Sequence, residues 1–126
     1  MQVWRKGLVL LSMLGGVLTA CSNNVSMSSA NHQVDVATGQ AKFAAVCANC
    51  HGEDATGIPN LGKNLTTSSF VKSKTDGELV AFISKGRDVT DPLNTTKVAM
   101  PPRGGNPTLT NDDLAAIVAY IRTLQK

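Results

Sequence analysis

The sequence contains few aromatic residues and little net charge. Aromatic residues make up 4% of the 126 positions, with a single Trp, Trp4, and a single Tyr, Tyr120. A domain of this size with so few large side chains has a thin hydrophobic core, so we expect a further source of stability. The formal charge is +3, and without Arg5 and Lys6 the balance of 10 basic and 9 acidic residues is +1. This balance gives no reason to expect a nucleic acid as a partner.

The sequence also lacks an apolar run long enough for a comfortable membrane span. The apolar run at positions 7–18 follows two basic residues and closes with Leu18-Thr19-Ala20-Cys21. A basic start, a short apolar run and small residues at its end are typical of an export signal. The closing tetrad resembles the box at which bacterial lipoproteins are cleaved and acylated on the cysteine. We therefore expect a signal peptide over residues 1–20 and lipidation of Cys21; an ordinary signal peptide and an uncleaved anchor are the alternatives.

The residues after Cys21 have the composition of a flexible tether. Residues 22–35 are rich in Ser and Asn and show no apolar period. A diacylglycerol together with an amide-linked chain anchors a protein stably, whereas one acyl chain holds it only marginally. We therefore expect residues 21–35 to tie a folded domain, residues 36–126, to a membrane of the cell envelope, on its periplasmic or other extracytoplasmic side. Ser22 is not the aspartate that is associated with inner-membrane retention in Gram-negative lipoproteins.

The other two cysteines belong to one short motif. Cys47-Ala48-Asn49-Cys50-His51 has the C-x-x-C-H order by which a c-type haem is covalently attached. Two intervening residues let one turn of backbone match the separation of the two haem vinyl groups, to which the thiols add. His51 then offers a ring nitrogen as the proximal iron ligand. We expect one covalent haem c on Cys47 and Cys50, and a poorly folded chain without it, because the haem supplies the missing apolar mass.

A C-x-x-C pair also occurs in redox dithiols and in zinc sites. A redox dithiol of the thioredoxin type needs a βαβ context, and this sequence does not alternate strands with helices. A zinc site needs four ligands. No second Cys or His pair completes such a set, because the only other histidine, His32, lies in the polar segment. Haem attachment is the interpretation that the rest of the sequence favours.

The domain shows helical patterns and no strand pattern. Residues 36–47 combine good helix formers with spaced apolar residues, and Gly39 within them predicts a close helix–helix crossing. Thr75-Asp76-Gly77-Glu78 has the form of a capping box and predicts a helix over residues 76–85. Thr110 and the acidic residues after it predict the start of a last helix with an apolar stripe. A further short turn of helix is expected near residues 68–72.

A long irregular segment with a candidate second iron ligand precedes the last helix. Between Arg87 and Leu109 several Pro and Gly residues exclude a regular element, and a loop of this length in a small domain is usually functional. Met100 lies in this loop, where Pro101 favours an extended conformation. Its thioether is a soft, neutral ligand that favours ferrous iron and raises the reduction potential. We predict Met100 as the distal ligand; the alternative is a core methionine that fills a gap.

The motif, Met100-Pro101-Pro102 and the two terminal helices resemble those of class I c-type cytochromes, over residues 36–126. The resemblance implies an all-α fold of three to four short helices around one covalently bound haem. It also implies that the first and last helices cross through a Gly and a Phe on one and an aliphatic residue and a Tyr on the other. The matching positions are Gly39, Phe43, Ile117 and Tyr120.

The resemblance also bears on the groups that support the haem. A proline carbonyl in this family hydrogen-bonds the proximal histidine, and Pro59 is the matching position. Some members use a Trp indole to bond a haem propionate, and residues 21–126 contain no Trp. The indole therefore has no counterpart in the domain.

The resemblance implies an electron carrier and not an enzyme. The expected function is a membrane-tethered monohaem carrier that passes single electrons from a redox donor to an acceptor, with His51 and Met100 as axial ligands and no small-molecule substrate. Two alternatives stay open. One is a haem enzyme or gas sensor with a labile sixth site, and the other is a fixed haem subunit of a respiratory complex.

Overall fold

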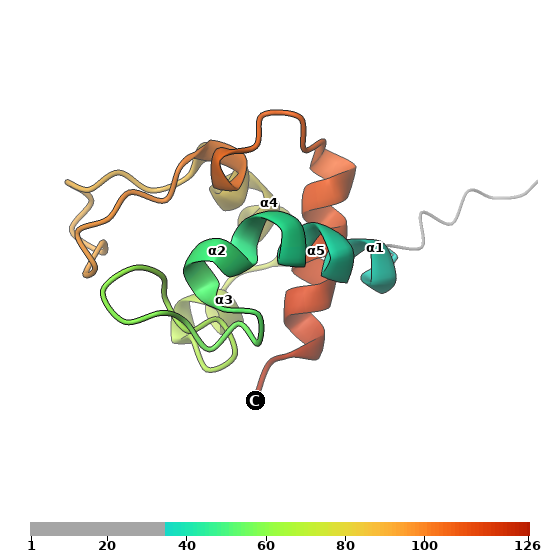
Figure 1. The fold of residues 1–126 in the computed structure, drawn as a ribbon, viewed down its shortest axis with the longest axis horizontal. Coiled ribbons are helices and arrows are strands. Elements are labelled where there is room, and N and C mark those ends of the chain that lie inside the picture. The colour runs from blue at the N-terminus through green and yellow to red at the C-terminus, as the bar shows by residue number, and fades with distance from the viewer. Residues whose placement is uncertain (1–34) are drawn as a thin grey trace, which may run out of the picture. The chain divides into compact units, whose positions relative to one another are not determined.

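The computed structural model describes residues 35–126, so the predicted signal peptide, Cys21 and nearly all of the tether lie outside the described residues. Helices supply the regular structure of this domain (Figure 1). In chain order they are α1 Val36–Lys42, a π-helical segment Phe43–Cys47, α2 Ala48–His51, α3 Ser69–Ser73, α4 Asp76–Lys85, a 3₁₀ turn Pro102–Gly105 and α5 Asn111–Thr123. The described residues form no strand, which confirms the all-α prediction. None of these helices is both long and apolar enough to cross a membrane.

The segment that leads into the haem motif is helical, as predicted, but its second half is wider than an α-helix. The Asp35 side chain caps α1 by accepting a hydrogen bond from the Ala37 N–H at 2.9 Å. The chain then passes through the π-helical segment into α2 and ends at Gly52, which has a φ of 79°. Single π-helical turns inside helices are frequently found at functional sites. Here the wide turn ends at Cys47, the first residue of the motif.

The predicted helix crossing lies between α1 and α5. Figure 1 shows α1 running across α5. A Cβ atom added to Gly39 would lie 1.9 Å from the main-chain oxygen of Ala116, so only glycine allows the two backbones to approach this closely. One turn later the rings of Phe43 and Tyr120 meet with their centroids 5.4 Å apart. The contact predicted from Gly39, Phe43, Ile117 and Tyr120 is confirmed at these positions.

We expect the variant Gly39→Ala to be strongly destabilised. The added methyl group collides with main-chain atoms of α5, and forced overpacking costs about 1–3 kcal/mol, here at its upper end because backbone cannot rotate away. Urea unfolding of the haem-loaded protein, followed by circular dichroism, would measure the loss. Gly77→Ala is the matched control, because a Cβ there meets nothing within 4 Å and a glycine-to-alanine change in a helix stabilises by up to about 1 kcal/mol. Equal midpoints for the two variants would contradict the close crossing.

Capping boxes begin both of the longer helices. Thr75 and Glu78 form one at the start of α4, and Thr110 and Asp113 form the other at the start of α5. In each box the main-chain N–H of the threonine donates to the carboxylate, at 2.8 Å in α4 and 2.9 Å in α5. These hydrogen bonds lower the pKa of Glu78 and of Asp113. The predicted bounds of α4 are confirmed because this start signal is local in the sequence.

The core of the domain follows α5. Leu114, Ile117 and Val118 are completely buried, together with Phe43 from the first helical segment. Helix α4 packs against the same helix, and its Leu79 and Ile83 belong to the same buried core. Several members of this core, Leu79 and Ile117 among them, also line a cavity.

Arg122 near the end of α5 fixes the position of α3 and of the start of α4. Its guanidinium donates to the main-chain oxygens of Val71 at 2.9 Å and Lys74 at 2.5 Å, and it pairs with the Asp76 carboxylate at 2.8 Å. Helix α3 is too short to be stable by itself. These contacts therefore hold it, and the Phe70 that it carries, beside α5.

Candidate haem site

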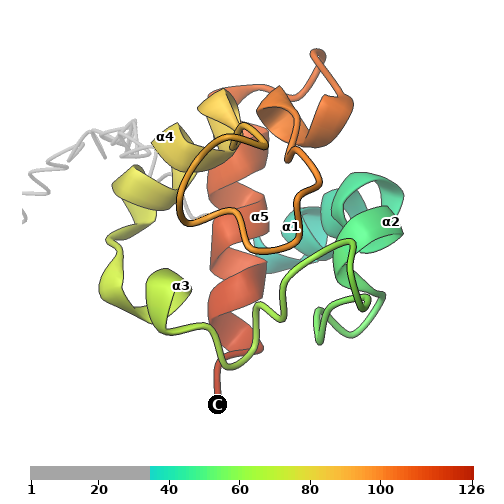
Figure 2. The same cartoon turned by 90° about the vertical axis from the view of Figure 1, so that its left-hand side faces the viewer.

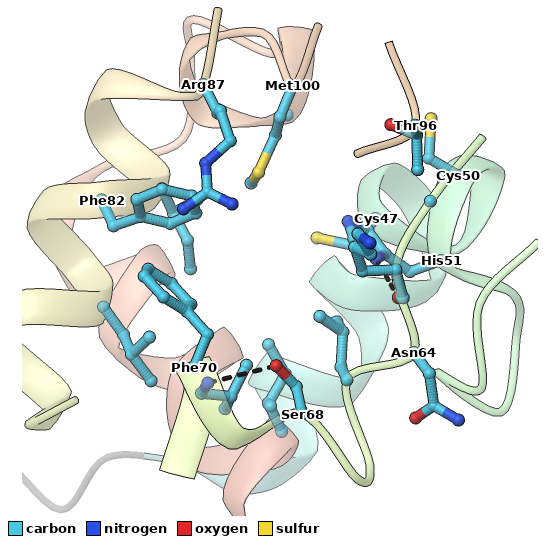
Figure 3. A pocket seen from close by; sticks show the side chains of 18 of the residues that line it. Cys47, Cys50, His51, Asn64, Ser68, Phe70, Phe82, Arg87, Thr96 and Met100 are labelled. Atoms are coloured by element: carbon cyan, nitrogen blue, oxygen red, sulfur yellow. Dashed lines mark hydrogen bonds between the residues drawn. The ribbon is translucent and has the colours of Figure 1, made fainter. Parts of the chain in front are cut away.

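A cavity of about 550 Å³ lies between the two halves of the domain. In Figure 2, α1 and α2 lie on one side of α5, and α3 and α4 lie on the other. The segment after α4 crosses in front of α5 in that view. The cavity is within the size range of small-molecule and cofactor sites, and its walls are mainly apolar. Cys47, Cys50 and His51 line one wall, and Met100 projects from the opposite wall (Figure 3).

The imidazole of His51 is held by a main-chain carbonyl of another loop. Its Nδ1 lies 2.8 Å from the main-chain oxygen of Lys63. A carbonyl oxygen can only accept, so Nδ1 carries the proton, and Nε2 keeps its lone pair for a metal ion. Such a hydrogen bond fixes the ring and raises the basicity of the other nitrogen.

The prediction that Pro59 supplies this acceptor is wrong. Residues Ile58 and Gly62 pair with each other through hydrogen bonds of 3.0 and 3.1 Å, so Pro59 lies at an exposed tip of the intervening turn. After this turn the chain passes against the motif again at Gly62, where an added Cβ would lie 2.0 Å from the main-chain oxygen of Cys50. This close approach brings Lys63, and not Pro59, beneath the His51 ring.

The two motif cysteines are free thiols. Cys47 and Cys50 are partly buried and form no disulfide with each other. Burial, followed by the proximity of Cys50, raises the pKa of the Cys47 thiol to about 11. Redox-active C-x-x-C thiols have lowered pKa values, so this environment does not match a dithiol oxidoreductase. Within residues 35–126, no three His, Cys, Asp or Glu side chains lie together in a way that could hold a metal ion.

A pair of backbone hydrogen bonds holds Met100 in its wall. The N–H of Arg87 donates to the Met100 oxygen at 2.8 Å, and the N–H of Met100 donates back to the Arg87 oxygen at 2.9 Å. Gly86, which ends α4 with a φ of 75°, lies so close that an added Cβ would be 2.2 Å from the same Met100 oxygen. The long loop is therefore closed at its base by an isolated bridge that the sequence pattern did not indicate.

Asn94 stabilises the interior of this loop. Its side chain is buried, and the amide nitrogen donates to the main-chain oxygens of Asp88 and Val98 at 2.9 and 2.8 Å. The amide oxygen accepts from the N–H of Lys97 at 3.0 Å. One side chain thus replaces the hydrogen bonds that a regular element would supply, and the irregular path predicted between Arg87 and Leu109 is ordered.

We expect Gly86→Ala to displace Met100 from its position in the cavity. Alanine is strained at a φ of 75°, and its methyl group would strike the main-chain oxygen of Met100. With Met100 as the predicted distal ligand, the ferric methionine-to-iron charge-transfer band of the haem-loaded protein should weaken, and carbon monoxide should bind the ferrous form faster. Gly77→Ala, which changes a glycine in open space, should leave both signals as in the wild type. An undiminished band in Gly86→Ala would contradict this role of Gly86.

Arg87, Phe70 and Phe82 also line the cavity, and they were not identified as site residues from the sequence. The guanidinium carbon of Arg87 lies 4.8 Å from the centroid of each ring, and the two rings meet edge to face at 5.0 Å. A single Arg after a helix is normally a solvated charge. The available signal was that Arg87 directly follows the glycine that ends α4.

The lining residues fit a covalent haem. Two free thiols and an imidazole with one unprotonated nitrogen lie on one wall, and a thioether lies on the other. The rest of the lining is mainly apolar, as a porphyrin ring requires. The charged side chains that line the cavity within the described residues are all basic: Lys63, Arg87 and Arg103. A haem carries two carboxylates, so its charge is complementary to this set.

Comparisons with known proteins agree with this fit. The family model described as cytochrome C oxidase, cbb3-type, subunit III matches residues 34–121. Cytochrome c-555 of Chlorobaculum thiosulfatiphilum is 34% identical over 87 residues, which are 69% of this chain and 93% of that protein. Cytochrome c-555 of Prosthecochloris aestuarii is 32% identical over 90 residues, which are 71% of this chain and 87% of that protein. The cbb3-type cytochrome c oxidase subunit CcoP of Rhodobacter capsulatus is 31% identical over 93 residues, 73% of this chain but 30% of the subunit.

The matched region contains all the helices of the domain except the end of α5. It includes the C-x-x-C-H motif, the crossing of the terminal helices and the loop that carries Met100. Fold, motif and relatives therefore agree on the cofactor, a covalently bound haem c. The chain belongs to the class I monohaem c-type cytochromes.

Proposed function

We propose that this cytochrome is a single-electron carrier whose haem is bound by Cys47 and Cys50 and ligated axially by His51 and Met100. The observation that carries the proposal is the placement of His51 and Met100 on opposite walls of one cavity that also exposes both thiols (Figure 3). The bound haem supplies a ferric–ferrous couple. A His and Met ligand pair gives such a couple a raised potential.

The protein's own groups keep both ligands fixed. Hydrogen bonding of Nδ1 to the Lys63 oxygen holds the His51 ring in one orientation. The bridge between Arg87 and Met100 holds the other ligand by its main chain. Since neither ligand needs to move when the charge changes, the reorganisation energy is small. The mainly apolar walls of the cavity exclude water, and this exclusion lowers the reorganisation energy further.

Two observations favour a carrier over a haem enzyme or gas sensor. Two relatives of this chain are named cytochrome c-555. His51 is the only histidine in residues 35–126, so none of the described residues supplies a distal histidine. A redox titration of the purified protein should follow a one-electron Nernst curve and return to the same spectrum after repeated cycles. Sustained turnover of hydrogen peroxide by the same preparation would instead support the enzyme.

A second candidate function is a fixed haem subunit of a respiratory complex. The similarity to subunit CcoP favours it, although this chain spans 30% of that protein. The chemistry would be the same, with a permanent partner in place of a transient donor and acceptor. Membranes solubilised in a mild detergent and separated by size-exclusion chromatography would discriminate between the carrier and the subunit. A free carrier elutes alone, whereas a subunit elutes with stoichiometric partners.

We also propose that residues 1–20 are removed, that Cys21 is lipidated, and that residues 21–35 tether the domain, residues 36–126, to a membrane on its extracytoplasmic side. The support is the order of basic, apolar and small residues before Cys21 and the polar segment after it. We expect the wild-type protein to incorporate radiolabelled palmitate and Cys21→Ser to incorporate none. Equal incorporation by the two proteins would contradict lipidation of Cys21.

A further inference from the structure

We infer that Arg87 binds a propionate carboxylate of the covalent haem, and that it thereby connects this carboxylate to the loop of the distal ligand. This inference rests on the proposed function, because it requires a haem in the cavity. Residues 35–126 contain no Trp that could bond a propionate. The inference gives this role to Arg87.

Arg87 stands where α4 ends and the loop of Met100 begins. Its main chain forms both hydrogen bonds of the bridge with Met100. Its side chain is 15% exposed, and Figure 3 shows it directed into the cavity beside Met100 and the Phe82 ring. The main chain of Arg87 is thus paired with Met100, while its side chain enters the cavity. Any group that the guanidinium binds is therefore fixed in position relative to Met100.

The two phenylalanine rings hold the guanidinium without using its N–H groups. The guanidinium carbon lies 4.8 Å from the centroids of both Phe70 and Phe82. Such a contact stabilises a cation through the negative face of the ring, and more strongly when the cation is desolvated. A guanidinium presents five N–H donors in its plane. Support by aromatic rings therefore orients the charge and leaves the planar donors for an acceptor.

The protein satisfies these donors only in part. Within the described residues the side chain makes one hydrogen bond, from Nη1 to the Leu93 oxygen at 3.3 Å. Nε is buried and has no hydrogen-bond partner, although the Asp91 carboxylate forms an ion pair with it at 3.4 Å. A buried donor without an acceptor is destabilising, because it has lost its hydrogen bonds to water. A carboxylate within the cavity would supply the missing acceptor and would bind in the planar, bidentate manner that arginine favours.

The other two cations of the cavity wall are already engaged. The Lys63 ammonium donates to the Thr95 hydroxyl. The Arg103 guanidinium donates to the Leu109 oxygen at 2.5 Å and to Asn111 Oδ1 at 2.9 Å. No Asp or Glu side chain of the described residues lines the cavity. Among the lining cations, Arg87 is thus the one with a buried donor still lacking an acceptor.

The most direct test uses the wild-type, haem-loaded protein in its ferrous, diamagnetic state. We expect nuclear Overhauser contacts between the Arg87 Nε–H or Nη–H protons and the methylene protons of one haem propionate, in protein with ¹⁵N-labelled arginine. An assigned Arg87 side chain with contacts to Phe70 and Phe82 and none to either propionate would overturn the inference. The same sample reports whether the haem is covalently bound and ligated by a methionine, so failure of the proposed function is recognised separately.

A charge-matched pair of variants measures the consequence. Removing the cation beside the propionate stabilises ferric iron. Arg87→Gln should therefore raise the ferric-to-ferrous ratio at fixed potential by about tenfold, which corresponds to a fall in the reduction potential of about 59 mV for one electron. Lys85→Gln removes an equal charge from an exposed position two residues away and should shift the potential much less. Arg87→Lys, which keeps the charge, should recover part of the difference. Equal reduction potentials for Arg87→Gln and Lys85→Gln would overturn the inference. If Arg87→Gln loses its methionine ligand, the nuclear Overhauser contacts of the wild-type protein decide.

Discussion

Replacing Met100 with alanine is expected to lower the reduction potential and to open the iron to carbon monoxide. The thioether is the group that projects from the wall opposite His51, and its loss leaves a water-accessible position that favours the ferric state. Axial ligands set haem potentials over a range of roughly 0.8 V, and we expect a fall on the order of 0.1–0.3 V. Redox titration and carbon monoxide binding to the reduced variant would measure the two effects.

The variant Met100→His separates the loss of a thioether from the loss of any ligand. A second imidazole fills the sixth position, so this variant should have a lowered potential and still not bind carbon monoxide readily. The potential and the carbon monoxide reaction of Met100→Ala would both stay at their wild-type values if Met100 only filled space in the core. That outcome would remove Met100 from the ligand set.

The haem-free chain is expected not to fold cooperatively. The double variant Cys47→Ala with Cys50→Ala cannot attach the haem and would leave the central cavity of about 550 Å³ unfilled. Cavity creation costs about 24 cal/mol per Å³, or about 13 kcal/mol for this volume. That is as large as the entire free energy of unfolding of a typical domain, about 5–15 kcal/mol. Far-ultraviolet circular dichroism during urea unfolding would test it.

Cys21→Ser is the matched control for this experiment. It also removes a cysteine, but it lies outside the described residues and leaves both haem cysteines in place. We expect it to unfold in one cooperative transition at the wild-type midpoint. A cooperative transition with a native helix signal in the double variant would show that residues such as Leu114 and Ile117 suffice as a core, and that the haem is not part of it.

Features encoded by neighbouring residues could be predicted from the sequence. The bounds of α4 follow from a capping box and a terminal glycine, and the start of α5 follows from Thr110 and the acidic residues after it. The close crossing followed from a helix-breaking glycine at Gly39 that needed a packing reason. For the two helix starts the physical cause lies within one helical turn of the residue that signals it. Gly39 signalled a crossing because glycine is costly inside a helix, although its contact partner, Ala116, lies on the distant α5.

Features that depend on contacts between distant segments could not be predicted. Lys63 replaces Pro59 as the partner of His51 because Gly62 approaches the Cys50 backbone, and no local pattern shows this approach. The bridge that holds Met100 likewise joins two residues across a loop without regular structure. Arg87 was missed for a related reason, since only the fold shows that two aromatic rings support its guanidinium.

The measurement that tests the central claim most directly is the absorption spectrum of residues 22–126, exported to the periplasm and purified. It should be recorded in the oxidised and reduced forms, with and without carbon monoxide. We predict a c-type reduced spectrum, a ferric methionine-to-iron charge-transfer band and no change on addition of carbon monoxide. Rapid carbon monoxide binding together with absence of the charge-transfer band would contradict the His51 and Met100 ligand pair and would place a haem enzyme or gas sensor first.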